Sequence, residues 1–427
     1  MSCIAHAVRH RMTFCLSLLC LFLTSIATVQ ATTTEAVFNR FKDRLVQVRI
    51  IDRATNSKTV LGSGFFIDQR GTIVTNYHVV SRVVFKPKDY RIEYVTEDNK
   101  IHNADLLNID VIHDLALLNG DAINTPSLHL REHAMKKGER IYTLGNPLDL
   151  GMTIVEGTYS GLTADTMSER ILLSGAINPG MSGGPSITQD GSIVGVNVAT
   201  AGNSIGFLVP GKFLHSLLQQ SRKGGKVQDY MQVIRHQLLD NQNTYISALL
   251  KKPFPVKRLG PFMVPAKLAA YLNCWGDSDD DHGPYTTADD FCAVKNDLFI
   301  KEDVRTGVIR YTNHLIKSDE LNRIRFYALM QAYFANPRSY LSGDEDNYTE
   351  FQCKAGFIRN GELRLKTAFC LRRYKAFPGV YDMILHSASL TQNHQGLITT
   401  LVLSGVSYKN AVAFSKAYLE SLTWKPR

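Results

Sequence analysis

The chain has 427 residues, of which 44% are hydrophobic, and a formal net charge of +9 at pH 7. This length exceeds one typical domain, so we expect two. The basic residues are spread along the sequence, with denser spots only at 222–226 and 251–252. This pattern favours a solvated surface over a site for a polyanion, and we expect no nucleic-acid partner.

The first 31 residues have the pattern of a secretory signal peptide. A basic start at 9–11 precedes an apolar run from Met12 to Val29, and Val29-Gln30-Ala31 ends the run with small residues. We therefore predict cleavage after Ala31 and export, to the periplasm or alternatively to the extracellular space. An uncleaved membrane anchor is the other interpretation of the run. No later segment is long and apolar enough to cross a bilayer.

Residues 36–221 form the first predicted domain, in which short apolar strands alternate with Gly, Asn and Asp turns. Many short strands without intervening helices indicate a sandwich or barrel. The strands are expected at 46–51, 62–67, 72–75, 91–96, 114–118, 140–144, 169–174, 193–199 and 206–209. A helix is expected at 212–220, and the glycine pair within 222–228 marks that stretch as a linker.

Three residues with complementary chemistry follow one another along this domain: His78 in TNYHVV, Asp114 in HDLALL and Ser182 in NPGMSGGP. A serine hydroxyl is a poor nucleophile at neutral pH unless an imidazole takes its proton and a buried carboxylate orients that imidazole. These residues are therefore our candidate catalytic triad. Ser182 would be the nucleophile, His78 the base and Asp114 the orienting acid.

Two neighbouring residues compete for these roles. Asp110 is the rival acid, but the apolar run 115–118 buries the backbone next to Asp114, and a buried carboxylate orients an imidazole best. His113 is adjacent to Asp114, so on a strand its side chain would point the other way. We therefore prefer His78 and Asp114.

Glycines surround the candidate nucleophile in the sequence Gly180-Met181-Ser182-Gly183-Gly184. Glycine lets the backbone turn sharply and lets a substrate carbonyl approach closely. The N–H groups of Gly180 and Ser182 can then stabilise the oxyanion that forms during acyl transfer. We predict an oxyanion hole made by these two groups.

Five fragments in this order, GSGFFI, TNYHVV, DLALL, AINPGMSGGP and IGFLVP, resemble the motifs of HtrA-type serine proteases of the chymotrypsin clan. The resemblance covers most of residues 60–210 and ends near residue 220. It implies an all-β, chymotrypsin-like double β-barrel and a trypsin-like endopeptidase that works through an acyl-enzyme. It also implies polypeptide substrates such as unfolded proteins, a role in protein quality control and no cofactor, and it is compatible with an oligomer.

The sequence departs from this family at positions that bear on activation and specificity. Met181 stands where digestive proteases have an aspartate that pairs with a freshly cut N-terminus, so no such activation is expected. Ser174 replaces a frequent aspartate beside the substrate channel. Ala176 matches the position of the aspartate that holds basic side chains in trypsin-like enzymes. Ile205 and Phe207 would line the pocket with apolar surface, so we expect an aliphatic P1 side chain.

Residues 229–427 indicate an α+β domain with an antiparallel meander, whose function the sequence leaves open. Helical spacing predicts helices at 227–250, 264–273, 318–335 and 408–422. Alternating apolar residues predict strands at 351–357 and 363–369, joined near Asn360-Gly361. The PDZ modules that usually follow an HtrA-type protease are not recognisable here. The rival to a protease is therefore a catalytically silent binding or adaptor protein that retains the barrel.

All cysteines outside the predicted signal lie in this second half: Cys274, Cys292, Cys353 and Cys370. An even set in an exported chain suggests two disulfides, with three possible pairings. The apolar alternation fits a three-residue turn at 359–361, which would place Cys353 and Cys370 on opposite faces. A two-residue turn would let them share a face, so the pairing stays open, with Cys274–Cys292 favoured as a local loop.

The acidic stretch from Asp277 to Gly283 invites comparison with a calcium loop. In an EF-hand register, however, the glycine position holds His282 and the bidentate acid position holds Ala288. We expect a solvated acidic loop and no metal site.

Overall fold

The computed structural model describes residues 33–164, 166–200, 204–225, 227–279, 283–295, 297–335, 341, 343–390 and 394–426. The predicted signal peptide, residues 1–31, lies outside this part of the chain, as does the centre of the acidic stretch at 280–282. Among the described residues, no helix combines the length and the hydropathy needed to cross a bilayer.

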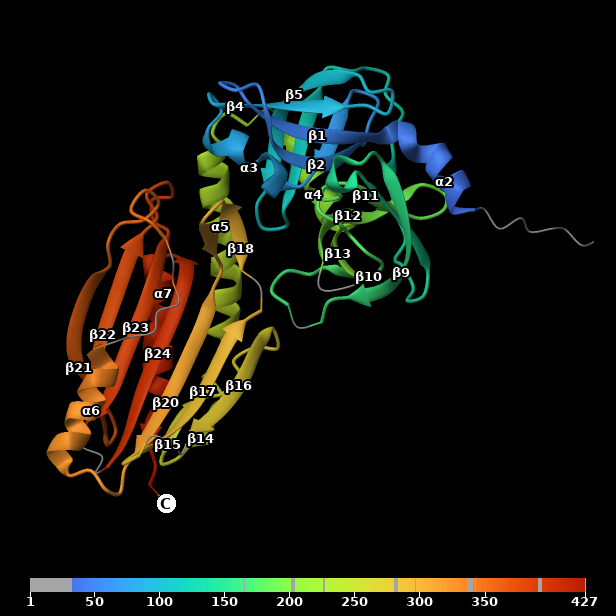
Figure 1. Ribbon diagram of the computed structural model, residues 1–427. Helices are drawn as coiled ribbons and strands as arrows, with labels where there is room; N and C mark the ends of the chain where they lie inside the picture. Colours follow the sequence, from blue (N-terminus) through green and yellow to red (C-terminus); the bar gives the residue numbers. More distant parts are fainter. Residues whose placement is uncertain are drawn as a thin grey trace, which may run out of the picture.

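The first barrel closes six antiparallel strands in the order β1-β2-β3-β6-β5-β4. The strands are β1 (Leu45–Asp52), β2 (Lys58–Phe66), β3 (Thr72–Thr75), β4 (Tyr90–Val95), β5 (Ile101–Asp110) and β6 (Leu115–Gly120). Helix α2 (Thr34–Phe41) and the 3-10 turn η1 (Lys42–Arg44) lead into the barrel, and helix α3 (Tyr77–Phe85) follows β3 (Figure 1).

The second barrel has the strand order β11-β8-β9-β10-β13-β12 and closes by pairing β11 with β12. Its strands are β8 (Arg140–Gly145), β9 (Thr153–Leu162), β10 (Ile171–Ser174), β11 (Pro185–Ile187), β12 (Ser192–Thr200) and β13 (Ile205–Pro210). The short strand β7 (His129–Leu130) joins β12 in parallel, η2 (Pro147–Asp149) follows β8, and helix α4 (Gly211–Gly224) closes the chain segment. The predicted double β-barrel is confirmed.

The second half is built on one antiparallel sheet with the order β16-β17-β20-β24-β23-β22-β21. Its strands are β16 (Leu272–Asp279), β17 (Thr286–Val294), β20 (Ile309–Lys317), β21 (Gln352–Asn360), β22 (Leu363–Arg373), β23 (Tyr381–Leu390) and β24 (Gln395–Val406). A small sheet joins β14 (Val256–Leu259), β15 (Phe262–Pro265) and β25 (Thr423–Trp424), and β18 (Leu298–Lys301) forms a hairpin with β19 (Val304–Thr306).

Three helices pack on this sheet: α5 (Tyr230–Leu249), α6 (Arg323–Ala335) and α7 (Tyr408–Ser421) (Figure 1). Leu385 and Leu401 pack in one cluster with Phe414 of α7, whereas Ala388 and Ile398 pack with Met330 of α6. Odd and even positions of a strand face opposite sides, so α6 and α7 cover opposite faces. The predicted α+β architecture with an antiparallel meander is confirmed.

The helix expected at 264–273 is wrong. Residues Phe262 and Val264 are buried at the two-residue period of strand β15, and the strand ends at Pro265. The Ala266 N–H then donates to the Pro255 carbonyl instead of starting a helical turn. Proline and this strand pairing override the weak helical spacing.

The three-residue turn in the meander is also wrong. Asn360 pairs with Leu363, which leaves a two-residue turn whose Gly361 has a φ of +58°. This register places Cys353 opposite Cys370, and the two form a disulfide. The other disulfide joins Cys274 and Cys292, which are opposed across β16 and β17. The β21 strand is exposed, so its apolar residues did not determine the register.

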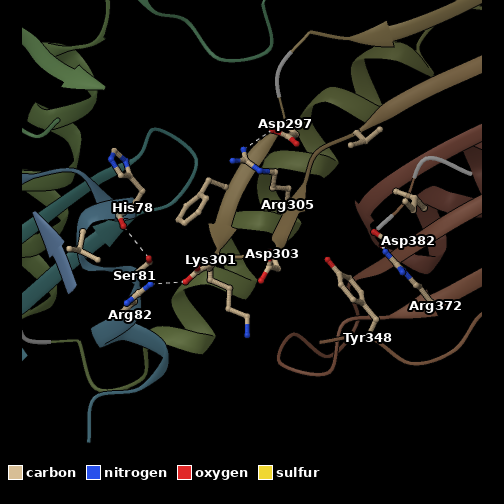
Figure 2. Close-up of a pocket in the computed structure, with 15 residues that line it drawn as sticks. His78, Ser81, Arg82, Asp297, Lys301, Asp303, Arg305, Tyr348, Arg372 and Asp382 are labelled. Carbon is tan, nitrogen blue, oxygen red and sulfur yellow. Dashed lines mark hydrogen bonds and ion pairs between the residues drawn. The ribbon is translucent and has the colours of Figure 1, made fainter. Parts of the chain in front are cut away.

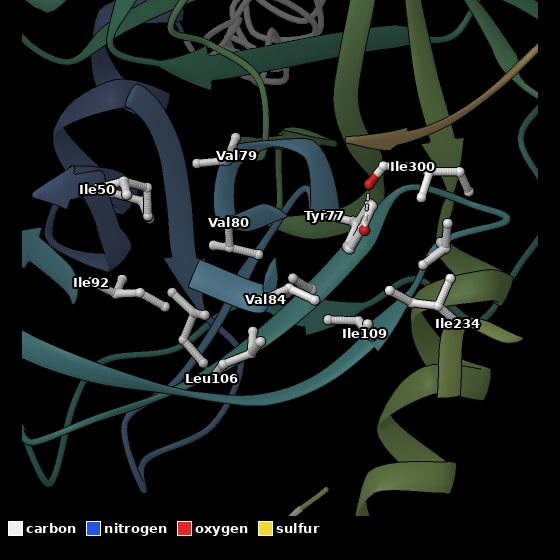
Figure 3. Close-up of a cluster of buried hydrophobic side chains, with 14 of the residues drawn as sticks. Ile50, Tyr77, Val79, Val80, Val84, Ile92, Leu106, Ile109, Ile234 and Ile300 are labelled. Carbon is white, nitrogen blue, oxygen red and sulfur yellow. Dashed lines mark hydrogen bonds between the residues drawn. The ribbon is translucent and has the colours of Figure 1, made fainter. Parts of the chain in front are cut away.

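One hydrophobic cluster crosses from the first barrel into the second half. Figure 3 shows Val80 and Ile109 from the first barrel, Ile234 from α5 and Ile300 from the β18–β19 hairpin in this cluster. Val380 also belongs to it. Each of these side chains is fully buried. The second half therefore packs against the same barrel that carries His78. The domain boundary at 222–228 remains a prediction.

Candidate active site

His78 occupies the first turn of α3, directly after the buried strand β3. Asn76 adopts an extended backbone at the N-cap of this helix, and its side-chain amide donates to the Asp114 carbonyl at 2.7 Å. The start of α3 is thereby fixed to the turn that carries Asp114. The first barrel alone supplies both candidate residues.

The His78 and Asp114 side chains form a pair. The His78 Nδ1 lies 2.7 Å from one carboxylate oxygen, and the His78 main-chain N–H donates to the other at 2.9 Å. Asp114 has a φ of +62°, a left-handed conformation that costs free energy for a residue other than glycine. Two hydrogen bonds to one residue hold this conformation and fix the imidazole plane.

The environment of His78 has two opposing effects on its pKa. Burial disfavours the imidazolium and lowers the pKa, whereas the negative charge of Asp114 and the hydrogen bond to it raise the pKa. The second effect prevails, so the pKa of His78 lies above its ordinary value. The pair is therefore arranged to stabilise an imidazolium, which a general base becomes when it accepts a proton.

The rival acid Asp110 has a different partner. His113 Nδ1 lies 2.6 Å from Asp110, and the His113 ring stacks on Phe213 with centroids 3.6 Å apart. The argument that placed His113 and Asp114 on alternate sides of a strand is wrong, because residues 111–114 form a turn between β5 and β6. The choice of Asp114 over Asp110 nevertheless agrees with the contacts.

Ser182 lies in a loop of the second barrel that the first barrel holds in place. The Ser63 N–H donates to the Ser182 carbonyl at 2.8 Å, and the Ser63 hydroxyl donates to the Gly180 carbonyl at 2.7 Å. Gly183 has a φ of +86°, and a Cβ there would lie 2.3 Å from the Ser63 carbonyl oxygen. Sequence reasoning missed Ser63, although it is the serine of the GSGFFI fragment.

The Ser182 hydroxyl donates to the Val198 carbonyl at 3.4 Å. Within the described residues, no hydrogen bond joins this hydroxyl to the His78 imidazole. The candidate nucleophile and the candidate base thus come from different barrels, and their side chains are not in direct contact within the described residues.

The backbone amides around Ser182 divide into two groups. The N–H groups of Met181, Gly183 and Gly184 donate to main-chain carbonyls at 2.9–3.1 Å. For the N–H groups of Gly180 and Ser182, the described part of the chain provides no such acceptor. Gly180 has a φ of +94°, which glycine adopts without strain. This division agrees with an oxyanion hole made by Gly180 and Ser182.

Met181 is fully buried in a cluster of the second barrel with Ile141, Leu173, Ile177 and Leu208. It therefore holds the loop by apolar packing, where an aspartate would need an ion-pair partner. The buried position of Met181 agrees with the expectation that the loop forms without an ion pair to a freshly cut N-terminus.

The three candidate pocket residues lie on or next to paired strands. Ser174 pairs with Ile205, and Leu172 pairs with Phe207 across β10 and β13. Ala176 follows β10 and is half-buried, as is Phe207, whereas Ile205 is 46% exposed. The strands therefore bring all three to one region of the second barrel.

His78 also lines a cavity of about 570 Å³. From the first barrel it is lined by Val60, His78, Ser81 and Arg82, and most other lining residues belong to the second half (Figure 2). None of the candidate pocket residues lines it. The sequence held no signal for this cavity, since it forms between segments more than 200 residues apart.

Residues 62–196 match the family of trypsin-like peptidase domains. The first half of this chain is therefore similar to trypsin-like peptidase domains. It is 32% identical over 185 residues to "Protease Do-like 1, chloroplastic" of Arabidopsis thaliana, with 39% of this chain and 40% of the relative covered. It is 30% identical over 201 residues to the "Probable periplasmic serine endoprotease DegP-like" of Chlamydia muridarum, with 44% and 39% covered.

Among solved structures, the serine endoprotease from Yersinia pestis matches at 26% identity and a TM-score of 0.40, covering 46% of this chain and 69% of that one. The matched segment spans about 40% of the length of the curated relatives. HtrA/DegP-like relatives thus match the N-terminal half, and the C-terminal region has no assigned family.

Proposed function

We propose that this chain is an exported serine endopeptidase. The observation that carries the proposal is the two-point contact between His78 and Asp114 in a trypsin-like peptidase domain. A carboxylate bonded to Nδ1 leaves Nε2 as the basic nitrogen of the neutral imidazole. Ser182, in the glycine-rich loop of the other barrel, is the nucleophile that this nitrogen would serve.

The reaction proceeds in two displacements. In the first, the Ser182 oxygen attacks the substrate carbonyl, His78 Nε2 takes the hydroxyl proton, and the N–H groups of Gly180 and Ser182 bind the oxyanion. His78 then gives the proton to the leaving amine, and the peptide bond breaks to leave an acyl-enzyme. A water molecule, deprotonated by His78, attacks the ester and releases Ser182.

The substrates we propose are polypeptides cut after an aliphatic residue. Ala176, Ile205 and Phe207 would surround that side chain with apolar surface, and none of them can pair with Arg or Lys. The proposal includes unfolded proteins as substrates and a role in protein quality control.

Export is part of the proposal. Disulfides form and persist in oxidising compartments, and this chain has two of them. One of the relatives is named as periplasmic. The predicted signal peptide at 1–31 agrees with both observations.

One observation favours a second candidate function, a silent binding protein that keeps the barrel. The Ser182 hydroxyl points to the Val198 carbonyl and makes no bond to His78. A protease whose serine turns to the base only when substrate arrives would look the same.

Labelling with a fluorophosphonate separates the two functions, because this reagent bonds only to an activated serine. The full chain should be labelled at Ser182, and Ser182→Ala should abolish labelling and cleavage of casein without changing thermal stability. Ser160→Ala, which changes an exposed serine of β9, is the matched control. If the wild-type chain is folded but is not labelled, the protein is the catalytically silent binding protein and not a protease.

A further inference from the structure

The helix that carries His78 is held from the second half of the chain. The Tyr77 hydroxyl donates to the Ile300 carbonyl of the β18–β19 hairpin at 2.5 Å (Figure 3). The Phe299 ring meets the His78 ring edge to face, with centroids 6.3 Å apart. Both Tyr77 and Ile300 are fully buried. The hairpin thus contacts the candidate base and its neighbour directly.

An ion pair extends this contact along α3. Arg82, one turn after His78, lies 2.9 Å from Glu302 in the turn of the hairpin. On the hairpin itself, the Arg305 guanidinium lies over the Phe299 ring and pairs with Asp297. Phe299 is therefore held between Arg305 and His78 and has little freedom to move away.

Helix α5 holds the segment that leads to Asp114. The Gln237 side-chain amide donates to the Ile109 carbonyl, and its oxygen accepts from the Val111 N–H, both at 2.8 Å. Tyr230 adds a bond from its hydroxyl to the Leu106 carbonyl at 2.7 Å. One glutamine thus satisfies two backbone groups at the end of β5, three residues before Asp114.

These contacts bear on the two elements that the His78–Asp114 pair joins. The hairpin holds α3, and α5 holds the turn after β5. A hydrogen bond of 2.7 Å weakens steeply when either partner shifts, and a displacement near 1 Å can cost roughly 100-fold in rate. The pair therefore depends on supports that come from outside the barrel.

We propose that the β18–β19 hairpin and helix α5 position His78 and Asp114 for catalysis, with Phe299, Tyr77 and Gln237 as the positioning residues. The proposal rests on the proposed function. It makes the second half a structural part of the active site, and it assigns the hairpin a supporting role, not an inhibitory one.

The test uses the full chain and removes one contact at a time. Gln237→Leu removes both backbone bonds, Tyr77→Phe removes only the hydroxyl, and Phe299→Leu removes the ring. Their controls are Gln232→Leu on the exposed side of α5, Tyr245→Phe, and Phe357→Leu, the same change at an exposed ring of β21. Tyr245 is a suitable control, because its buried hydroxyl has no hydrogen-bond partner among the described residues.

We expect the three variants to lower kcat and the rate of fluorophosphonate labelling roughly tenfold or more, with KM for a short peptide little changed. The controls should behave as the wild type. Wild-type labelling rates in all three variants, with tryptophan fluorescence showing a folded second half, would overturn the proposal. Faster labelling would overturn it too, because it would mean that the hairpin obstructs the site.

A measurement independent of activity separates this proposal from the proposed function. A proton on His78 Nδ1 bonded to Asp114 gives a downfield NMR resonance, assigned by its loss in His78→Ala. We expect Gln237→Leu and Phe299→Leu to broaden or abolish this resonance and Gln232→Leu to leave it. An unchanged resonance in these variants overturns the positioning role. A wild-type chain that fluorophosphonate does not label overturns only the proposed protease activity.

Discussion

Replacing Ile300 by alanine should loosen the barrel that carries His78, although Ile300 belongs to the other half. The side chain is fully buried in the cluster that joins both halves, and its removal leaves a cavity. An isoleucine-to-alanine change at such a site costs about 2–5 kcal/mol. A loss of about 3 kcal/mol corresponds to roughly a hundredfold change in an opening equilibrium.

Native-state hydrogen exchange followed by mass spectrometry measures this opening without reference to activity. Amides of α3 and β5 should exchange roughly a hundredfold faster in Ile300→Ala. The matched control is Ile309→Ala, which removes an equally buried isoleucine from a cluster made only of second-half residues. It should destabilise the second half and leave exchange in α3 unchanged.

Tryptophan fluorescence reports the second half separately, because the chain has only two tryptophans, Trp275 and Trp424. Both isoleucine variants should lower the denaturant midpoint seen by this probe. If Ile300→Ala shifts that midpoint but leaves the exchange of α3 and β5 at wild-type rates, the halves do not share their stability, and the reasoning from the common cluster is refuted.

Three further changes test the site and the second half. Asp114→Asn should lower the pKa of His78, since the charge of Asp114 raises it. The rise of kcat/KM with pH, which follows loss of the imidazolium proton, should then move to lower pH, and its plateau should fall on the order of 10⁴-fold. An unmoved pH profile would show that Asp114 is not the partner of His78. Gly183→Ala should lower the thermal midpoint far more than Gly151→Ala, because both have positive φ but only the first places a Cβ 2.3 Å from backbone oxygen; equal midpoints would contradict the crowding. Replacing Cys353 and Cys370 together by serine should cost about 3 kcal/mol by urea unfolding, and an unchanged midpoint would show that the disulfide adds no stability.

Much of the barrel was predictable because its strands have short apolar runs between turn residues. The expected strand 72–75 coincides with β3, and most others differ from the observed bounds by one to four residues. The barrel strands β5, β9 and β11 were missed. The β5 sequence IHNADLLNID has many polar residues, the β9 sequence TIVEGTYSGL has polar residues and glycines, and β11 has only three residues. In the structure each of these strands is hydrogen-bonded to a neighbouring strand on both sides, and this pairing stabilises it.

No element was predicted for residues 77–85, which include His78. The sequence YHVVSRVVF is rich in β-branched and aromatic residues, which favour strands, yet residues 77–85 form α3. Tyr77, Val80 and Val84 are buried on one side of it, so tertiary packing overrides the local preference.

For the site, motif order was enough to choose His78 and Asp114, whose contact the structure shows. The support from Phe299 and Gln237 was beyond prediction, because no local pattern in a sequence indicates a contact between residues more than 100 positions apart. Ser63 lay inside a recognised fragment and could have been found by asking which side chain fixes the loop of Ser182.

Both outer strands of the large sheet, β16 and β21, are joined by a disulfide to the strand next to them. An outer strand has one row of backbone groups without a sheet partner, so it is where a sheet frays and where foreign chains add on. The two covalent links lie at these margins, and within the sheet the inner strands rely on hydrogen bonds and packing. Reduction would thus act from the margins inward, and each strand released would turn its neighbour into a new template for aggregation.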